Sequence, residues 1–289
     1  MPAPVIVWFR QDLRLGDNPA LQAALDLDRP IVPVYIRDEA AAGRWQPGGA
    51  SRWWLHGSLG CLDADLRRRG SRLNLRTGDS LAVLSALIRD TGAEAVHWAR
   101  CYEPGEAALE ARLREQLGDL ATLRRFGGRL LFQPEGIRTA ADRPFQVFTP
   151  FWRACLAAPV PQPPVAAPDD LPAPATWPAS ESLAEWDLLP TAPDWSGGLR
   201  AAFTPGEAAA LECVEAFLDG AVHHYRSARD QPGIAGTSRL SPHLHFGEIS
   251  PRQVWHAVQA SMAAGVVPEG EGSGFLRELG WREFSAHLL

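Results

Sequence analysis

Short apolar runs alternate with longer helical segments over the first 130 residues of this 289-residue chain. The alternation is typical of repeated βα units that surround a parallel sheet. Asn18 and Pro19 form a helix start, with a capping side chain followed by proline in the first turn. The sequence therefore predicts an α/β domain with a doubly wound parallel sheet. Its expected strands are 4–9, 31–36, 72–76, 94–99 and 121–125, and its expected helices are 19–27, 51–69, 79–91 and 105–118.

Loops at one edge of this sheet are the expected positions for a ligand. Doubly wound sheets bind ligands outside the carboxyl ends of their strands, here after Phe9, Ile36 and Ala99. The turn after the first strand reads RQDLRLGDN and lacks G-x-G-x-x-G, so we do not expect standard dinucleotide binding. A different small ligand, or none, is indicated at this edge.

Proline and alanine dominate residues 157–200, which we interpret as an extended connection, too rich in these residues for a packed element. The segments beyond it have helical periodicity, with no strand between them: 206–228, 250–264 and 273–289. The predicted division is an α/β domain, a connecting segment and a helical domain, at 1–130, 131–202 and 203–289.

The last predicted helix reaches Leu289 without a Gly, Asn or Pro stop signal. A domain of about 85 residues is also small for covering its own core. We therefore expect the helical domain to be incomplete and the chain to be truncated at its C-terminal end.

Composition argues against several classes of protein. The net charge of -6 does not indicate a general affinity for polyanions. Four scattered cysteines without C-x-x-C spacing, and histidines without H-x-x-x-H spacing, predict neither a metal site nor a disulfide framework. No apolar run approaches the ~20 residues needed to cross a bilayer. The first residues lack a secretory signal, so we expect a cytoplasmic protein.

Three hydroxyl side chains lie close together at Thr237, Ser238 and Ser241, beside Arg239. Ser241 is followed by Pro242, a pair that is typical of a helix start. Free N–H groups, hydroxyls and a guanidinium at such a position suit a phosphate or pyrophosphate. Plain helix capping is the alternative, and the residues alone favour it.

A polar and aromatic stripe is predicted on the last helix. Spacings of three and four place these residues on one face: Phe275, Glu278, Trp281, Arg282 and Ser285. The face could stack on a flat aromatic ligand while the carboxylate and guanidinium make polar contacts. The alternative is a Glu–Arg helix pair worth only ~0.2–0.5 kcal/mol beside a buried aromatic.

Two further features bear on the same region. Gly280 lies inside the last helix, where glycine costs roughly 1 kcal/mol relative to alanine, so a ligand or a crossing helix is expected to need the room. Tyr225 lies four residues before Arg229 on one helical face, although Arg229 and Asp230 could also form an ion pair at a helix end.

Together, Y-x-x-x-R-D at 225–230, TSRLSPHLHFGEISPR at 237–252 and FLRELGWREFSAHLL at 275–289 resemble the photolyase and cryptochrome family. WFRQDLRLGDNPAL at 8–21 is similar to the family's opening strand and loop, so the resemblance covers nearly the whole chain. It implies an antenna-binding α/β domain and a helical domain that holds a U-shaped FAD. It also implies that the reduced, excited flavin donates an electron to a cyclobutane pyrimidine dimer in UV-damaged DNA.

The resemblance also implies roles for individual residues. Glu278 would hydrogen-bond the flipped dimer, Trp281 would pack against it, and Arg229 would contact the DNA backbone. The residues that would bind or enclose FAD are Tyr225, Thr237, Ser238, Arg239, Leu240, Ser241, Phe275 and Arg282.

Two departures from the family pattern limit these expectations. Glu106 matches the acidic residue of a folate-antenna motif, but Gly105 replaces its asparagine. A second, antenna chromophore therefore stays open between methenyltetrahydrofolate and a deazaflavin. Full-length relatives continue well past the position of Leu289, where their adenine and isoalloxazine contacts lie, so we expect weak FAD binding or none.

The leading hypothesis is a deoxyribodipyrimidine photo-lyase, a carbon–carbon lyase that acts as a cytoplasmic monomer. A cryptochrome-type blue-light receptor without repair activity is the second hypothesis, because it would share the flavin site. The third is an inactive, truncated product in which only the α/β domain folds.

Overall fold

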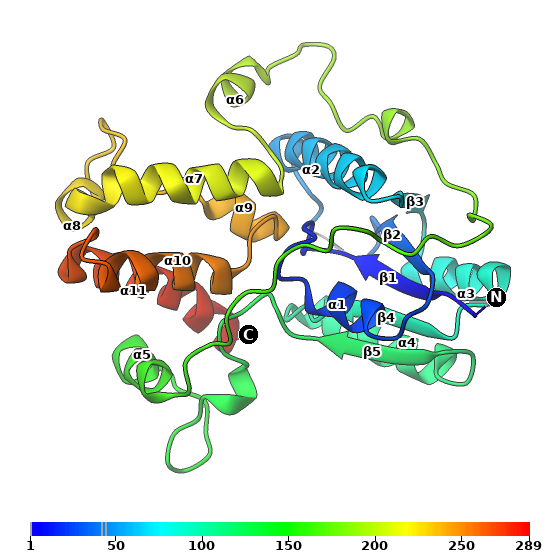
Figure 1. The fold of residues 1–289 in the computed structure, drawn as a ribbon, viewed down its shortest axis with the longest axis horizontal. Coiled ribbons are helices and arrows are strands. Elements are labelled where there is room, and N and C mark those ends of the chain that lie inside the picture. Colours follow the sequence, from blue (N-terminus) through cyan, green and yellow to red (C-terminus); the bar gives the residue numbers. More distant parts are fainter. Residues whose placement is uncertain (1, 42, 44) are drawn as a thin grey trace.

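The computed structural model describes residues 2–41, 43 and 45–289, which form an α/β body and a helical body side by side (Figure 1). The α/β body contains a five-stranded sheet in the order β3-β2-β1-β4-β5, and every neighbouring pair is parallel. The doubly wound prediction is confirmed. The strands are β1 (Val5–Phe9), β2 (Ile31–Arg37), β3 (Asn74–Thr77), β4 (Ala95–Ala99) and β5 (Thr122–Phe126).

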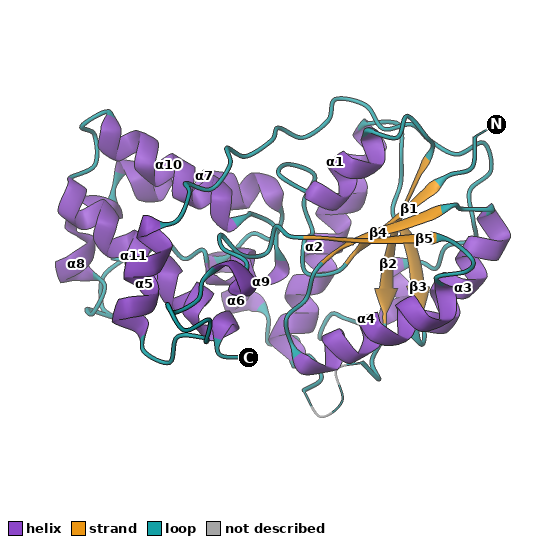
Figure 2. Cartoon of the chain, turned by 90° about the horizontal axis from the view of Figure 1, so that it is seen from below, coloured by secondary structure: helices purple, strands orange, loops and turns teal. Residues whose placement is uncertain are grey.

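Helices cover both faces of the sheet (Figure 2). Side chains of β1 alternate between the two faces: Val5, Val7 and Phe9 contribute to one core, and Ile6 and Trp8 contribute to the other. Full burial on both faces explains why β1 reads as a continuous apolar run. The first core is closed by α1 (Pro19–Leu25) and α2 (Gly49–Arg68), and the second by α3 (Ser80–Thr91) and α4 (Pro104–Leu117).

The proline-rich segment after residue 157 is extended, as expected, but it is packed, contrary to expectation. Its backbone continues the hydrogen bonding of the α/β body, where Ile31 N donates to the Pro172 carbonyl at 2.7 Å and Leu171 N donates to the Arg69 carbonyl at 2.9 Å. Trp186 is buried against the first core. The backbone of the α/β body thus supplies hydrogen-bond partners for the segment, which its proline- and alanine-rich composition did not indicate. It contains η2 (Leu183–Trp186) and is followed by α6 (Gly197–Ala202).

The rest of the chain is helical, and no strand occurs among the described residues after 203, as predicted. Helix α5 (Phe148–Ala157) was not predicted, because its ten residues lie in the segment assigned to a connection. It packs on α11 (Glu269–His287) through aromatic side chains that include Phe151 and Phe284. The predicted domain boundaries stay a prediction. The elements are η1 (Pro134–Gly136), α5 (Phe148–Ala157), α7 (Glu207–Asp219), η3 (Ala221–His224), α8 (Tyr225–Ala228), α9 (Ser241–Phe246), α10 (Pro251–Ala263) and α11 (Glu269–His287).

Buried polar contacts join the two bodies. The Arg14 guanidinium donates to the carbonyls of Asp17, Gly128 and Gly247 at 2.8–3.2 Å. Glu248 is fully buried and accepts hydrogen bonds from Trp54 and Ser58 of α2. Because both buried charged side chains are hydrogen-bonded across the boundary, the contacts hold the bodies in one arrangement.

No helix in the described part of the chain combines the length and the apolar character needed to cross a bilayer. No group of three or more His, Cys, Asp or Glu side chains is arranged to hold a metal ion among residues 2–41, 43 and 45–289.

Candidate functional site

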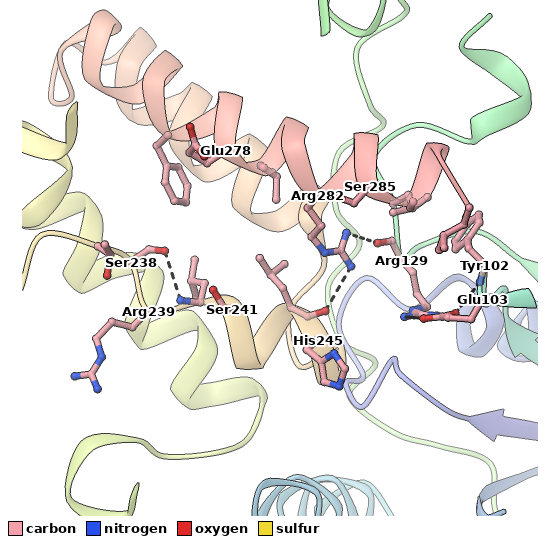
Figure 3. Close-up of a pocket in the computed structure, with 18 of the residues that line it drawn as sticks. Tyr102, Glu103, Arg129, Ser238, Arg239, Ser241, His245, Glu278, Arg282 and Ser285 are labelled. Carbon is pink, nitrogen blue, oxygen red and sulfur yellow. Dashed lines mark hydrogen bonds and ion pairs between the residues drawn. The ribbon is translucent and has the colours of Figure 1, made fainter. Parts of the chain in front are cut away.

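A cavity of about 710 Å³ lies where the helical body meets loops of the α/β body (Figure 3). Its volume is in the range of cofactor and ligand sites, about 300–1,000 Å³. The residues with predicted FAD-binding roles all line it, together with Glu278: Tyr225, Thr237, Ser238, Arg239, Leu240, Ser241, Phe275 and Arg282. Segments that are more than fifty positions apart in the sequence therefore form one surface.

Ser241 does not cap a helix, so the capping interpretation is wrong for this residue. Leu240 has helical dihedral angles (φ -78°, ψ -7°) and occupies the N-cap position, which places Ser241 within the first turn of α9. Its exposed hydroxyl makes no capping hydrogen bond. By contrast, Ser250 caps α10 and accepts from the backbone N–H of Gln253 at 3.0 Å. Ser241 is thus left available to the cavity.

The backbone turns sharply at Arg239, where φ is +57°, a left-handed conformation that costs a non-glycine residue free energy and that clusters at functional sites. Ser238 Oγ accepts from Leu240 N at 3.4 Å across this turn. The Arg239 guanidinium does not face the other polar groups of the cavity: it lies over the Phe203 ring, 4.3 Å from the centroid. Its predicted phosphate contact would require the side chain to reorient.

The predicted stripe on α11 is correct except at Trp281. Phe275, Glu278, Arg282 and Ser285 line the cavity. Trp281 instead stacks on Phe148 of α5, with ring centroids 3.7 Å apart and planes 8° from parallel. Trp281 lies at the edge of the stripe, and the unpredicted α5 supplies an aromatic partner there. Trp281 is still 43% exposed.

Gly280 leaves room for a crossing helix and not for a ligand. A Cβ atom at this position would lie 2.5 Å from the Trp152 indole of α5. The expectation that something packs against this glycine is therefore confirmed, and the neighbour is an aromatic side chain.

Ion pairing at the cavity differs from the predicted Glu278–Arg282 helix pair. Glu278 forms an ion pair with Arg229, which also lies 3.5 Å from Asp230. Hydrogen bonding to Glu278 raises the pKa of Arg229. Arg282 pairs with Glu283 at 3.2 Å and donates to the Arg129 carbonyl at 2.7 Å. Two residues with predicted DNA contacts, Arg229 and Glu278, thus neutralise each other in this structure.

Sequence reasoning named the loop after Ala99 as a ligand position but did not assign the residues that the α/β body contributes to this cavity. Tyr102 and Glu103 follow β4, and Arg129 follows β5. Arg129 pairs with Glu103 at 3.4 Å, and the Tyr102 hydroxyl donates to Gln133 at 2.8 Å. The available signal was the loop after Ala99, which lies at the carboxyl end of a strand.

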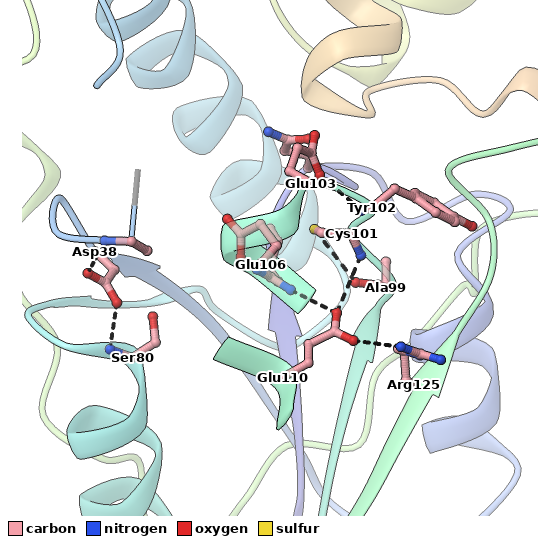
Figure 4. Close-up of polar contacts among 12 residues, drawn as sticks. Asp38, Ser80, Ala99, Cys101, Tyr102, Glu103, Glu106, Glu110 and Arg125 are labelled. Atoms are coloured by element: carbon pink, nitrogen blue, oxygen red, sulfur yellow. Dashed lines mark hydrogen bonds and ion pairs between the residues drawn. The ribbon is translucent and has the colours of Figure 1, made fainter. Parts of the chain in front are cut away.

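A second cavity of about 210 Å³ lies at the carboxyl ends of β1 and β2, at the predicted ligand edge. Glu106 lines it and pairs with Arg10, which lies 3.3 Å from the buried Glu110 (Figure 4). Asp38 also lines it and accepts from the backbone N–H of Ser80 at 2.8 Å. The pocket joins charged groups to the aromatic side chain of Trp8.

Comparison with known proteins identifies the family to which this chain belongs. The sequence profile of the DNA photolyase family matches residues 5–169, more than half of the chain. The chain belongs to the DNA photolyase family. This photolyase-family chain is 46% identical to the deoxyribodipyrimidine photo-lyase of Agrobacterium fabrum, over 99% of its own length and 59% of that protein. It is 34% identical to cryptochrome-1 of Arabidopsis thaliana, over 98% and 42% of the two lengths.

The fold agrees with that assignment. A bacterial class III photolyase from Agrobacterium tumefaciens superposes with a TM-score of 0.95 at 46% identity, and the match covers 100% of the photolyase-family chain and 59% of that structure. The chain thus spans about three fifths of the length of this relative.

Proposed function

We propose that this chain binds FAD in the 710 Å³ cavity and belongs to a deoxyribodipyrimidine photo-lyase that repairs cyclobutane pyrimidine dimers in UV-damaged DNA. The observation that carries the proposal is the convergence of the hydroxyl side chains after residue 236, Arg282 and Phe275 on one cavity. When bound and reduced, FAD supplies on illumination the electron that opens the cyclobutane ring.

The cavity suits such a cofactor chemically. Leu240, Leu244 and Phe275 provide apolar walls, as expected around a flat aromatic group. The free hydroxyl of Ser241 and the guanidinium of Arg282 are donors for the diphosphate or the ribityl chain. Tyr225 packs edge-on against Phe275, with centroids 5.4 Å apart, which fixes both rings.

Lesion recognition would use Glu278, Trp281 and Arg229. Glu278 lines the cavity and would accept hydrogen bonds from an extruded dimer. Trp281 would offer its outer ring face, since Phe148 covers the inner one. Arg229 would exchange its pairing with Glu278 for a DNA phosphate, which would free the carboxylate for the lesion.

A repair assay tests the proposal. The chain is incubated with reduced FAD and dimer-containing oligothymidine under blue light, and restored thymine absorbance is measured. We expect Glu278→Gln to slow repair by at least tenfold, because the neutral amide accepts less strongly. The control Glu269→Gln removes an exposed carboxylate at the start of the same helix and should repair at the wild-type rate.

The outcomes separate the alternatives. FAD retention without restored thymine favours a cryptochrome-type receptor, in line with the 34% identity to cryptochrome-1 of Arabidopsis thaliana. Absence of bound flavin contradicts the cofactor assignment for this chain. Equal repair by wild type and Glu278→Gln contradicts the role of that glutamate.

We also propose that the 210 Å³ cavity receives one end of the antenna chromophore, with Glu106 and Arg10 as polar contacts, because its volume is below that of sites that enclose a whole ligand. Methenyltetrahydrofolate and a deazaflavin remain the two candidates, and absorbance of each after gel filtration with the chain distinguishes them. The monomeric state and the cytoplasmic location belong to the same proposal, and light scattering and cell fractionation test them.

A further inference from the structure

Glu283 is a buried carboxylate on α11 that points away from solvent and is surrounded by donors. Its Oε2 atom accepts from the backbone N–H groups of Leu131 at 2.7 Å and Phe132 at 3.2 Å. Its Oε1 atom accepts from the Arg282 guanidinium at 3.2 Å. The residue is only 2% exposed, so water does not substitute for these partners.

These bonds join two parts of the cavity wall. The chain between Arg129 and Phe132 leaves the α/β body and runs along α11, where Arg282 donates to the Arg129 carbonyl at 2.7 Å (Figure 3). The Arg129 side chain then reaches Glu103 across the end of the cavity. One carboxylate therefore restrains both the 129–132 segment and Arg282, which lies beside it on α11.

The electrostatic setting of Glu283 includes titratable groups from α11 itself and from three other parts of the chain. Arg282 lies on α11, Arg129 follows β5, Tyr102 follows β4 and Cys155 lies on α5. Burial raises the pKa of Glu283 to about 7, against the attraction of Arg282. Burial also raises the pKa of Cys155 to about 12, and the charge of Glu283 adds to that rise. Arg282 is thus the counter-charge in hydrogen-bond contact with Glu283.

We propose that Glu283 is a positioning residue for the cofactor cavity, which acts by holding Arg282 and the 129–132 segment together. Glu283 does not line the cavity, so it acts through its partners. The inference rests on the proposed function, because FAD is the ligand that Arg282 would contact.

Glu283→Gln is an informative variant because it preserves the shape of the side chain. All partners of Glu283 are donors, and glutamine has one acceptor oxygen and a donor NH₂ group. It can satisfy either the two backbone amides or Arg282, but not both. A protonated Glu283 faces the same conflict, so the variant also imitates the wild-type chain at low pH.

Three measurements follow on the 289-residue chain. We expect Glu283→Gln to weaken FAD binding at least tenfold at pH 8. Independently of cofactor, either the Arg282 Nε–H resonance broadens or hydrogen exchange at Leu131 and Phe132 accelerates at least tenfold. Wild-type affinity should fall as pH drops from 8 to 6, while the affinity of the variant stays flat.

A matched control is Glu207→Gln. Glu207 also clamps two consecutive backbone N–H groups, of Leu15 and Gly16, but lies outside the cavity. It should accelerate exchange at its own two amides and leave FAD affinity and its pH profile as in the wild type. A general loss of packing would change both variants alike.

A double-mutant cycle with Arg282→Gln tests whether Glu283 acts through Arg282. The effect of Glu283→Gln on FAD affinity should shrink to less than twofold in the Arg282→Gln background. An undiminished effect, or unchanged exchange and resonance in Glu283→Gln, overturns the inference. If the wild type binds no FAD at any pH, the proposed function fails, and the exchange and resonance data still decide the positioning role.

Discussion

Two Ser-Pro pairs in the helical body have the same sequence and different structural roles. Ser250 accepts from Gln253 N in a capping box and donates to Asp17 across the interface between the bodies. Ser241 makes neither contact. Sequence could locate both helix starts, but the dihedral angles of the preceding residue decide which serine caps, and these angles depend on the left-handed turn at Arg239.

Alanine substitution should separate the two serines. Ser250→Ala removes a cap and a buried hydrogen bond and should lower the free energy of unfolding by about 1–3 kcal/mol. Ser241→Ala should change it by less than about 0.5 kcal/mol and weaken FAD binding. Urea denaturation and flavin titration measure the two effects. Equal destabilisation by both variants would show that Ser241 is a cap after all.

Glu283 should make stability depend on pH with an unusual sign. Burying the charge costs more than its donors return, so the folded-state pKa of about 7 lies above the ordinary value of 4.5. The folded chain is therefore most stable with Glu283 protonated, below pH 4.5, and loses that stability as pH rises through 7, although only the ionised form accepts from all three donors. The difference between wild type and Glu283→Gln should fall by roughly 3 kcal/mol over that range. Urea midpoints at several pH values between 4.5 and 8 measure it, and a constant difference would contradict the assignment.

Titration of the histidines does not produce the same dependence of stability on pH. Burial lowers the pKa values of His56, His97, His245 and His287. Stability linked to a lowered histidine pKa rises with pH, which is the opposite direction. These contributions also cancel when the variant is compared with the wild type.

At the scale of elements, periodicity predicted what is long and regular. All five strands and the helices of the α/β body lie within about two residues of their expected bounds, because burial imposes a repeating apolar pattern on them. Helix α5 escaped detection because ten residues beside prolines carry little periodic signal. An aromatic side chain of α5, Phe148, determines where Trp281 lies. Trp281 was therefore assigned wrongly to the cavity because the helix that contacts it was not predicted.

The contact between α5 and α11 gives an element-scale prediction. Gly280→Ala would place a methyl group against the Trp152 indole, and the strain should outweigh the ~1 kcal/mol gain in helix propensity, for a net loss of about 1–3 kcal/mol. Thermal and urea unfolding measure the change.

Gly270→Ala in the same helix is the control. Its added carbon meets only the far end of the flexible Arg226 side chain, at 3.8 Å, so the variant should be neutral or more stable. A stabilising Gly280→Ala would mean that α5 does not pack closely on α11.

For the whole molecule, sequence predicted two bodies but not how they meet. The residues that join them are polar and lie in loops, so no periodicity marks them. Arg14 looks like an ordinary loop arginine in the sequence, yet it is 1% exposed and bonded to carbonyls of both bodies. Arg129, on the α/β side of the cavity, was missed for the same reason, whereas the loop that carries Tyr102 was an expected ligand position.

Arg14→Met should therefore uncouple the bodies. It leaves three buried carbonyls without their donor and should destabilise the chain by about 3–5 kcal/mol. We expect urea unfolding to separate into two transitions, and limited proteolysis to release the α/β body.

Arg67→Met is the comparison. Arg67 forms an exposed helix pair with Asp63, and its loss should cost less than about 1 kcal/mol without changing the shape of the transition. A single transition in both variants would mean that other contacts suffice to couple the bodies.

The cavity takes its walls from both bodies, with Tyr102, Glu103 and Arg129 on one side and α8, α9 and α11 on the other. A molecule that fills it spans the seam between them, so its binding energy adds directly to the cohesion of the pair. Dissociation of the bound molecule then requires the interface between the two bodies to open. The residence time of the bound molecule should therefore be set by the slow opening of the two bodies relative to each other. A tightly bound molecule should dissociate only shortly before the bodies separate.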